Sequence, residues 1–406
     1  MKLSSNTADF IVIGAGVIGL TIAKELKKRH PDSHIIILEK EVREGEHASG
    51  RNSGVLHAGF YYTKDSLKAK FTKQGNAALT DYCLQKQIPI NRCGKLVVAR
   101  NEHDLSGLYE LLERGKQNDI ELQLISATDA EKIEPRAKTF EKALFSPTTS
   151  SVDPRHVLHH LLEDARDEGI HIEFETKYIR HTNNRTYIIH TNKQKYHCRY
   201  LINTAGLYAD KIARDFGFSE HYSILPFKGL YLYASDPSEK LNVHVYPVPA
   251  LENPFLGVHF TVNVNGVLKI GPTAIPAFWR EQYQGFESLN YRELSEIVFR
   301  EIGLFLRAGF DFRKLAWNEI KKYNRKTLVK HANELVQNVN VKQYQKWGKP
   351  GIRAQLLNTK TRKLEMDFIT EGDDRSFHVL NAVSPAFTCS IPFARFTVDQ
   401  IQRLIK

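Results

Sequence analysis

A glycine-rich turn near the N-terminus constrains the fold more than any other feature of the chain. Gly14, Gly16 and Gly19 follow a short apolar run at residues 9–13 and open a helical pattern at residues 17–28. In such a G-x-G-x-x-G pattern the first glycine permits a tight turn, the second lets the backbone approach a pyrophosphate, and the third lets helix and strand pack closely. The helix N-terminus offers unpaired N–H groups and a positive dipole end to phosphate. We therefore predict a dinucleotide site that includes Gly14, Gly16, Val17, Ile18 and Gly19.

A second strand is predicted at residues 34–38, and it ends at Glu39. Its unbroken apolar run is typical of a parallel strand that is buried on both faces. Glu39 stands 20 residues after Gly19, where a carboxylate accepts hydrogen bonds from ribose hydroxyls, and we assign the adjacent Lys40 to the same site. A carboxylate at this position disfavours a 2′-phosphate, so NADP is not expected. The pattern alone leaves FAD and NAD open.

The number of glycine patterns bears on the choice between FAD and NAD. Flavoenzymes that are reduced by NAD(P)H commonly carry a second glycine-rich dinucleotide site, and the sequence has none after Gly54. If the single site holds FAD, the electrons must come from an organic substrate and leave to oxygen, a quinone or a protein carrier.

Composition and charge exclude several other classes of protein. A hydrophobic content of 42% with 25% charged residues describes a folded globular chain. The four cysteines have no spacing typical of metal ligands, so we expect reduced thiols and no metal site. The net charge of +11 is not accompanied by a basic stripe interleaved with aromatic residues, so we expect no nucleic-acid partner. No stretch approaches the roughly 18 apolar residues that a membrane span needs.

The rest of the chain predicts a discontinuous nucleotide-binding domain around a second domain. We assign residues 1–85, 150–215 and 345–406 to the first domain and residues 86–149 and 216–344 to the second. Between residues 225 and 273 the sequence becomes aromatic and rich in proline, which predicts an antiparallel sheet. Helices are also expected at residues 66–86, 155–168, 291–308, 326–339 and from the turn at 384–385 to Lys406, and strands at 171–174, 187–190, 200–203 and 377–382.

The segment SGRNSGVLHAGFYY at residues 49–62 resembles the L-2-hydroxyglutarate dehydrogenase/oxidase family, within the D-amino-acid-oxidase-like FAD superfamily. The resemblance continues through nearly the whole chain, at residues 93–96, 204–208, 226–229, 246–249, 255–261, 271–272, 351–355 and 381–390. It implies an α/β protein with a Rossmann-like FAD-binding domain and an antiparallel-sheet substrate domain. The implied reaction is oxidation of an L-2-hydroxy acid, most specifically L-2-hydroxyglutarate to 2-oxoglutarate, with electrons passed to a quinone or oxygen.

The resemblance also implies which residues bind the FAD. Ser49 to His57 would line the pyrophosphate and the isoalloxazine, the backbone near Thr176 would contact the adenine, and Thr204 to Gly206 would support the cofactor. Residues 384–390 would present backbone N–H groups to the pyrimidine edge of the flavin. Besides the glycine turn, Glu39 and Lys40, the expected cofactor residues are Ser49, Arg51, Asn52, Ser53, Gly54, Val55, His57, Thr176, Thr204, Ala205, Gly206, Arg353, Ser384, Ala386, Phe387, Thr388 and Cys389.

Four residues are expected to act on the substrate. Arg353 matches the place where related amine and hydroxy-acid oxidases hold a carboxylate, which a guanidinium grips bidentately. His57 and His259 are candidate proton acceptors, because the unperturbed pKa of histidine is close to neutral pH. Each of them can instead be a buried histidine that only satisfies backbone groups. A dicarboxylate needs a second cation, for which we expect Lys228, and an exposed edge-strand lysine is the alternative.

Two further functions remain open at this point. One is an amino-acid or amine oxidase of the glycine or D-amino-acid type, and the other is a flavin-binding protein without turnover. A covalent link from His57 to the flavin is a third alternative for that residue. The polar N-terminus leads directly into a strand, which predicts a cytoplasmic protein. A peripheral contact of the amphipathic C-terminal helix with the inner face of the cell membrane is a further hypothesis.

Overall fold

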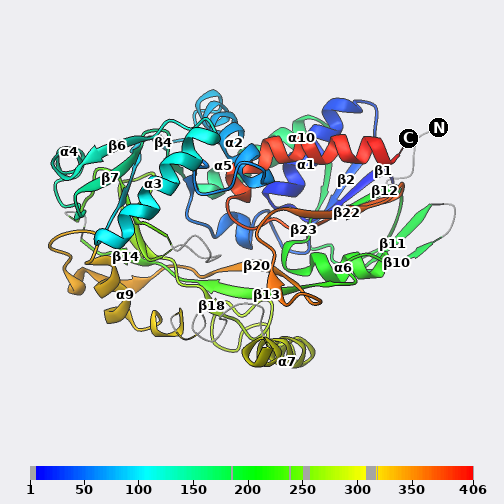
Figure 1. Cartoon of the computed structure of the whole chain (residues 1–406). Coiled ribbons are helices and arrows are strands. Elements are labelled where there is room, and N and C mark those ends of the chain that lie inside the picture. Colours follow the sequence, from blue (N-terminus) through cyan, green and yellow to red (C-terminus); the bar gives the residue numbers. More distant parts are fainter. Residues whose placement is uncertain are drawn as a thin grey trace. The chain divides into compact units, whose positions relative to one another are not determined.

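The chain forms two compact units in the computed structural model, which describes residues 6–183, 186–236, 239–249, 257–307, 317 and 319–405. Unit 1 consists of residues 1–52, 154–225 and 354–406, and unit 2 consists of residues 53–153 and 226–353 (Figure 1). Neither unit is continuous in sequence. No helix among the described residues combines the length and the apolar content that crossing a membrane requires.

Unit 1 is built on a mostly parallel sheet. The strand order is β10-β11-β12-β1-β2-β9, and β23 also pairs with β12 and with β22. The pairs β1–β12, β1–β2, β2–β9 and β12–β23 are parallel. Continuous apolar runs such as Ile35–Leu38 are buried throughout, as expected for a parallel sheet covered on both faces. The strands are β1 (Thr7–Ile13), β2 (Ile35–Leu38), β9 (His171–Glu173), β10 (Tyr178–Asn183), β11 (Tyr187–Thr191), β12 (Lys195–Asn203), β22 (Ile369–Gly372) and β23 (Ser376–Asn381).

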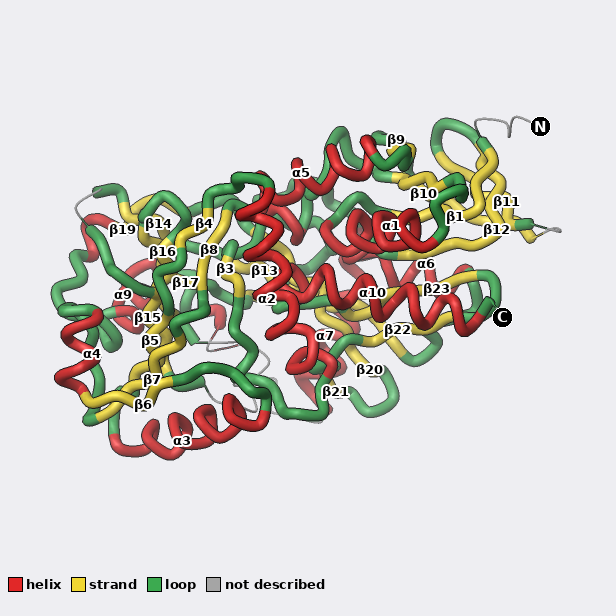
Figure 2. Tube along the Cα trace, turned by 90° about the horizontal axis from the view of Figure 1, so that it is seen from above, coloured by secondary structure: helices red, strands yellow, loops and turns green. Residues whose placement is uncertain are grey.

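The helices of unit 1 are joined to one another by polar contacts as well as apolar packing. The N-terminal helix α1 lies beside the C-terminal helix α10 (Figures 1 and 2), where the Thr21 hydroxyl donates to the carbonyl oxygen of Ser390 at 3.3 Å. Lys24 of α1 forms an ion pair of 2.7 Å with Asp164 of α5. These helices are α1 (Val17–Arg29), α5 (Pro154–Asp167), α6 (Ala209–Asp215) and α10 (Ala386–Leu404).

Unit 2 is built on an eight-stranded sheet with the order β19-β14-β17-β16-β15-β5-β7-β6. Every neighbouring pair in this sheet is antiparallel except β5–β15, which is parallel. A smaller sheet has the order β3-β8-β4. The strands are β3 (Val55–Leu56), β4 (Ile90–Asn91), β5 (Lys95–Val98), β6 (Gln123–Ser126), β7 (Lys142–Ser146), β8 (Ser150–Val152), β14 (Leu232–Ala234), β15 (His244–Pro247), β16 (His259–Val262), β17 (Leu268–Gly271) and β19 (Tyr344–Trp347).

One face of the eight-stranded sheet supplies the apolar core of unit 2. Leu96, Val245, Phe260 and Ile270 occupy neighbouring strands in register and are fully buried. They belong to one apolar cluster with Leu328, Val329 and Ala332 of α9. Burial of such side chains contributes roughly 1.5–3 kcal/mol each, so this face is committed to stability. The helices of unit 2 are α2 (Leu67–Gln85), α3 (Glu102–Gln117), α4 (Ala127–Ile133), α7 (Tyr291–Arg307) and α9 (Arg325–Ala332).

The chain passes between the units within β13 (Tyr222–Gly229) and again within β20 (Gly351–Asn358). In unit 2, β18 (Ile275–Pro276) pairs with residues 227–228, and in unit 1, β21 (Lys363–Leu364) pairs with residues 357–358.

The compact units and the expected domains have different boundaries. Residues 53–85 were assigned with the nucleotide-binding segments but belong to unit 2. There β3 pairs with β8, and the Asn76 side chain of α2 donates to the carbonyl oxygens of Leu56 and His57. Compactness does not define a functional domain, so the division into an FAD-binding and a substrate domain stays a prediction.

The expected helix at residues 326–339 is wrong in its second half. Helix α9 ends at Ala332, and Asn338 has a φ of 55°, which a right-handed helix does not allow. Val336 forms an isolated antiparallel bridge with Ala137, so tertiary pairing overrides the apolar spacing. Four parts of the expected elements lie outside the described residues, namely residues 237–238, 250–256, Ala308 and Lys406.

Candidate active site

The glycine turn of unit 1 leaves no room for side chains. Gly14 has a φ of 104°, and a Cβ atom there would lie 2.9 Å from the carbonyl oxygen of Thr204. A Cβ atom on Gly19 would overlap the carbonyl oxygen of Gly14, so the third glycine permits the close approach of α1 to β1. A Cβ atom on Gly16 would lie 2.9 Å from the Ser49 hydroxyl. All three positions therefore require glycine.

The N-terminus of α1 is left without a capping side chain from its own first residue. Gly16 is the N-cap residue and makes no side-chain hydrogen bond, and no acidic residue stands in the first turn. The backbone N–H of Val17 donates to the Ser49 hydroxyl at 3.0 Å, and Ile18 is the next buried residue. The N-terminus of this 13-residue helix therefore fits the phosphates of a dinucleotide.

Glu39 lies directly after β2 and is 8% exposed. Its carboxylate accepts hydrogen bonds from the backbone N–H groups of Ala15 at 2.7 Å and Glu41 at 2.9 Å. Burial raises the pKa of Glu39, and these two hydrogen bonds oppose that shift. The backbone N–H of Thr176 donates to the Glu39 carbonyl at 2.8 Å, so the expected ribose and adenine residues are adjacent. The ammonium of Lys40 pairs with Glu41 and lies 5.6 Å from the Tyr208 ring.

The remaining unit 1 residues of the predicted cofactor site support the glycine turn and the loop beside it. Thr204 donates its hydroxyl proton to the Ile13 carbonyl at 2.8 Å and is followed by Ala205 and by Gly206, which has a φ of 53°. In the loop, Asn52 donates its side-chain amide to the Ser49 carbonyl at 2.6 Å, and Arg51 pairs with Glu46 at 3.6 Å. The loop conformation is thus held by its own side chains.

The last predicted cofactor segment forms the start of α10. Pro385 is the N-cap residue of this 19-residue helix and makes no side-chain hydrogen bond to its first turn. Within that turn Ala386, Thr388 and Cys389 are buried, whereas Phe387 is half-buried and Ser384, just before the helix, is exposed. The contact between Thr21 and Ser390 places the first turns of α1 and α10 close together. Unit 1 therefore combines a glycine turn with two helix N-termini whose own N-cap residues make no side-chain hydrogen bond, as a dinucleotide site requires.

Unit 2 carries a row of polar side chains on the face of its sheet opposite the apolar core. Lys95 is in register with His244 and with Ser146, and Lys269 is in register with Thr261 and Tyr233. Because Val245 pairs with Phe260, His244 and Thr261 are also neighbours. Side chains alternate between the faces of a strand, so this row points away from the apolar cluster. The row consists of Ser146, Lys95, His244, Thr261, Lys269 and Tyr233.

Burial of this polar row is unusual, since Lys95 and His244 are fully buried and Lys269 is 4% exposed. The segment before β3 covers part of it: the Lys269 ammonium donates to the Ser53 carbonyl at 2.7 Å. Gly54, at a φ of 75°, accepts a hydrogen bond from the backbone of Val152, and Val55 lies in β3. The predicted residues Ser53, Gly54 and Val55 are therefore placed beside the polar face.

Within unit 2, His57 interacts electrostatically with both His259 and Arg353. Burial lowers the pKa of His57, and electrostatic interactions with Lys95, His259, His244 and Arg353 lower it further. Burial also lowers the pKa of the half-buried Arg353. A site rich in cations and neutral imidazoles is suited to an anionic substrate.

The two sheet histidines differ in the roles of their ring nitrogens. His259 lies with Nδ1 2.8 Å from the Gly257 carbonyl, so Nδ1 carries the proton and Nε2 has a free lone pair. His244 accepts a hydrogen bond from Val262 at Nδ1, and its Nε2 lies 3.4 Å from the Cys93 sulfur. Burial lowers the pKa of each to about 3. His259 is therefore placed as a proton acceptor, whereas both nitrogens of His244 are committed.

The sequence analysis did not identify the two lysines of this face, Lys95 and Lys269, and selected Lys228 on β13 instead. Lys228 is half-buried on β13, in register with Ile275, and burial lowers its pKa. Lys95 and Lys269 are the buried cations in the polar row. Their signal in the sequence is a lysine within an otherwise apolar strand, as in Lys-Leu-Val-Val at residues 95–98 and Leu-Lys-Ile-Gly at residues 268–271.

Comparisons with known proteins give the chain its relatives. A family model described as FAD dependent oxidoreductase matches residues 9–400. The mitochondrial L-2-hydroxyglutarate dehydrogenase of Bos taurus is 35% identical, over 100% of this chain and 91% of the relative. The L-2-hydroxyglutarate dehydrogenase of Escherichia coli strain K12 is 32% identical, over 98% of this chain and 94% of the relative.

Solved structures share the fold at lower identity. An L-alpha-glycerophosphate oxidase from Mycoplasma pneumoniae with FAD bound has a TM-score of 0.78 at 22% identity, covering 98% of this chain and 95% of that chain. A glycine oxidase from Geobacillus kaustophilus has a TM-score of 0.73 at 17% identity, with the same coverage of both chains. The α/β fold class expected from the sequence is confirmed.

Proposed function

Because the chain belongs to the FAD-dependent oxidoreductase family and, within it, to the L-2-hydroxyglutarate dehydrogenases, we propose that it oxidises L-2-hydroxyglutarate to 2-oxoglutarate. The observation that carries the proposal is the buried cationic face of unit 2, with Arg353 and two neutral histidines beside it. Such a face matches an anionic hydroxy acid, and it lies in a chain whose glycine turn fits a dinucleotide.

The residues of unit 1 would hold the dinucleotide part of FAD, mainly through backbone N–H groups and the Glu39 carboxylate. The N-terminus of α1 would bind the pyrophosphate, and Glu39 would accept hydrogen bonds from the ribose hydroxyls. The start of α10 would stabilise negative charge on the flavin. When bound, FAD supplies the two-electron acceptor for the oxidation. We also propose that FAD binding involves Ser53, Gly54, Val55 and His57.

Arg353 would bind the carboxylate beside the reacting carbon, because its planar guanidinium matches a carboxylate in a bidentate pair. His259 would take the hydroxyl proton at Nε2, since the contact with Gly257 holds its other nitrogen protonated. A substrate carboxylate beside the ring would raise the low pKa of His259, because a negative charge favours the imidazolium. His57 would position the substrate from the same cluster.

The electrons would leave to a quinone or to oxygen, because no second glycine pattern for NAD(P)H follows Gly54 in the sequence. A cytoplasmic location and a peripheral membrane contact stay predictions. The apolar face of α10 packs within unit 1, with Phe393, Ala394, Val398 and Ile401 buried. A membrane contact by this helix would therefore rely on its exposed end, and fractionation of cells tests it.

An amino-acid oxidase is the alternative activity, and the likeness to glycine oxidase supports only the shared fold. A panel of L- and D-2-hydroxy acids and amino acids, mixed with the purified holoenzyme under anaerobic conditions, tests both. We expect loss of the oxidised flavin absorbance with L-2-hydroxyglutarate and not with amino acids. Reduction by an amino acid alone would replace the proposed substrate, and reduction by none of them would favour a flavin-binding protein without turnover.

A further inference from the structure

Lys95 is a buried cation whose ammonium has no hydrogen-bond partner among the residues that the structure describes. The side chain is fully buried at the first position of β5. Three aromatic rings surround the nitrogen, which lies 4.7 Å from the centroid of Phe60, 4.6 Å from Tyr61 and 4.8 Å from Tyr246. The Tyr61 hydroxyl is buried without a hydrogen-bond partner in the same part of the chain.

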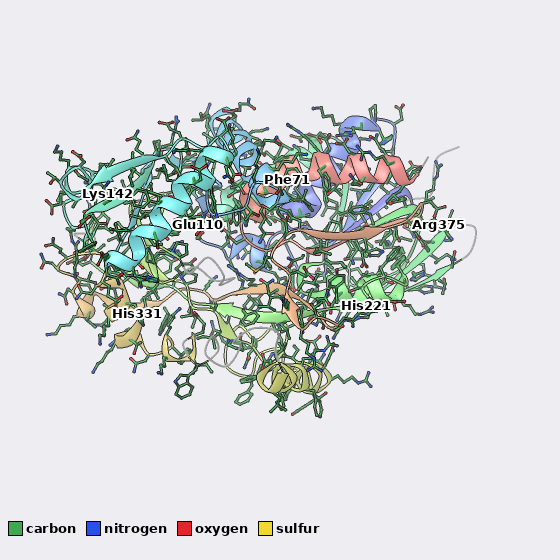
Figure 3. The ribbon with its side chains drawn as sticks, viewed as in Figure 1. Phe71, Glu110, Lys142, His221, His331 and Arg375 are labelled. Carbon is green, nitrogen blue, oxygen red and sulfur yellow. The ribbon has the colours of Figure 1, made fainter. Side chains whose placement is uncertain are left out.

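Two other lysines of the sheet show what is unusual about Lys95. Lys142, which is labelled in Figure 3, lies on the neighbouring strand β7 and is partly exposed. Its ammonium is 5.6 Å from the centroid of the Tyr109 ring. Lys269 is buried in the polar row, but its ammonium donates to the Ser53 carbonyl. Lys142 is thus partly open to solvent and Lys269 has a carbonyl acceptor, whereas the residues that the structure describes offer the Lys95 ammonium aromatic rings and no hydrogen-bond acceptor.

A buried ammonium without a counterion is unfavourable, and aromatic rings compensate for only part of the lost hydration. Within the described part of the chain, the charged or titratable groups around Lys95 do not supply a negative charge. They are His244, which pairs with Lys95 from the neighbouring strand β15, and also His57 and His259, whose pKa values Lys95 lowers. Burial lowers the pKa of Lys95 itself to about 7. An anion that enters this cluster would give the ammonium the partner that the described residues do not provide.

We propose that the Lys95 ammonium binds the distal carboxylate of the substrate, so that this chain selects 2-hydroxy acids with two carboxylates. The inference rests on the proposed function, in which Arg353 takes the carboxylate next to the hydroxyl. Both cations act on His57, so each lies within electrostatic reach of the same imidazole. Lys95 thus takes the place that the sequence suggested for Lys228.

A structural lysine or a proton acceptor would behave differently from a carboxylate anchor. Removing an anchor affects only substrates that carry the distal carboxylate, whereas removing a proton acceptor slows every hydroxy acid. The comparison of L-2-hydroxyglutarate with L-2-hydroxybutyrate, which lacks that carboxylate, separates these roles. Lys142→Met is the matched control, because Lys142 is a strand lysine of the same sheet outside the polar row.

We expect Lys95→Met to lower kcat/KM for L-2-hydroxyglutarate about 100-fold, mainly through KM, as for the loss of one partner of a buried ion pair. We expect kcat/KM for L-2-hydroxybutyrate to change less than about threefold, and Lys142→Met to leave both substrates unchanged. An equal loss for both substrates, or no loss for either, would overturn the proposal.

Binding of glutarate to the wild-type holoenzyme tests the same proposal without turnover and without a variant that must fold. A carboxylate raises the pKa of the lysine that it pairs with, so binding at pH 8 should take up protons from the buffer. Calorimetry in two buffers of different ionisation enthalpy measures this uptake, and butyrate should show none. Glutarate binding without proton uptake, or no glutarate binding, contradicts the role of Lys95. If glutarate binds with uptake but L-2-hydroxyglutarate does not reduce the flavin, only the proposed oxidation fails.

Discussion

The two units present their candidate binding groups in different ways. Unit 1 uses backbone: three glycines at which an added Cβ atom would come within 3.0 Å of other atoms, and two helix N-termini whose N-cap residues make no side-chain hydrogen bond. Unit 2 uses side chains: two lysines, a histidine, a tyrosine, a serine and a threonine from six strands form a largely buried polar row on one sheet face. A backbone site depends on a few residues close in sequence, whereas a side-chain site depends on strands that are far apart in sequence and meet only in the fold.

This difference has an energetic side. Backbone N–H groups at a helix end are polar in any sequence, so a dinucleotide site can be built without burying charge. The polar row of unit 2 buries Lys95 and Lys269, for which desolvation lowers the pKa to about 7 and about 8. We therefore expect unit 1 to fail through sterics when it is altered, and unit 2 through changes in charge and pH dependence.

The largest effect is expected from Gly19→Val, which tests the backbone site. A side chain at this position would overlap the Gly14 carbonyl, and α1 would have to move away from β1. We expect the purified variant to contain less than about a tenth of the wild-type flavin, because the phosphate site is displaced. Absorbance of the released flavin measures this. Gly303→Ala is the control, because no atom of the described residues lies within 4 Å of its added Cβ atom. Normal flavin content in Gly19→Val would break the contrast between the units.

The next largest effect concerns stability and pH at Lys95. Its folded pKa is lowered from 10.5 to about 7, so between these values the unfolded state binds more protons and stability rises with pH. The destabilisation is fully present below pH 7 and disappears towards pH 10.5. We expect Lys95→Met to be more stable than wild type by on the order of 4 kcal/mol at pH 6.5, with a smaller gain at pH 9.

Urea unfolding of the substrate-free holoenzyme at several pH values measures that difference. Lys142→Met should track the wild type at every pH, since its ammonium reaches solvent. A gain from Lys95→Met that does not depend on pH would mean that better apolar packing, and not relief of a buried charge, stabilises the variant.

A smaller effect, in binding and not in folding, is expected from Arg353→Lys. The variant keeps the positive charge but loses the bidentate geometry. We expect KM for the hydroxy acid to rise about 10- to 30-fold with a lesser change in kcat. Steady-state kinetics with a fixed electron acceptor measures both constants, and wild-type kinetics would remove Arg353 from the substrate site.

The smallest effect is expected from Glu39→Gln, which keeps the shape of the side chain in unit 1. The amide retains one acceptor for the backbone N–H groups of Ala15 and Glu41 but loses the charge. We expect FAD affinity to fall about tenfold, as for the loss of one charge-assisted hydrogen bond. Titration of the apoprotein with FAD measures the affinity, and an unchanged value would show that the carboxylate serves only the turn.

The same contrast explains how far the sequence alone could lead. The order of β1, α1 and β2, the three glycines and Glu39 follow from local spacing, and the structure has them at those positions. The polar row could not be assembled in this way, because Lys95, His244 and Lys269 lie in strands with few other polar residues and their register depends on tertiary pairing. Lys228 was chosen because its context is also apolar, but that context could not reveal that it is only half-buried. The helix predicted at residues 326–339 was too long because the bridge between Val336 and Ala137 depends on tertiary pairing and leaves no signal in local spacing.

An anaerobic titration of the holoenzyme with L-2-hydroxyglutarate tests the proposed reaction most directly. Each equivalent of substrate should remove the oxidised absorbance of one equivalent of flavin and yield one equivalent of 2-oxoglutarate, because the oxidation transfers two electrons. We expect the L isomer to complete the reduction and the D isomer to leave the flavin oxidised. A flavin that stays oxidised with the L isomer, or is reduced without formation of 2-oxoglutarate, would contradict the proposed function.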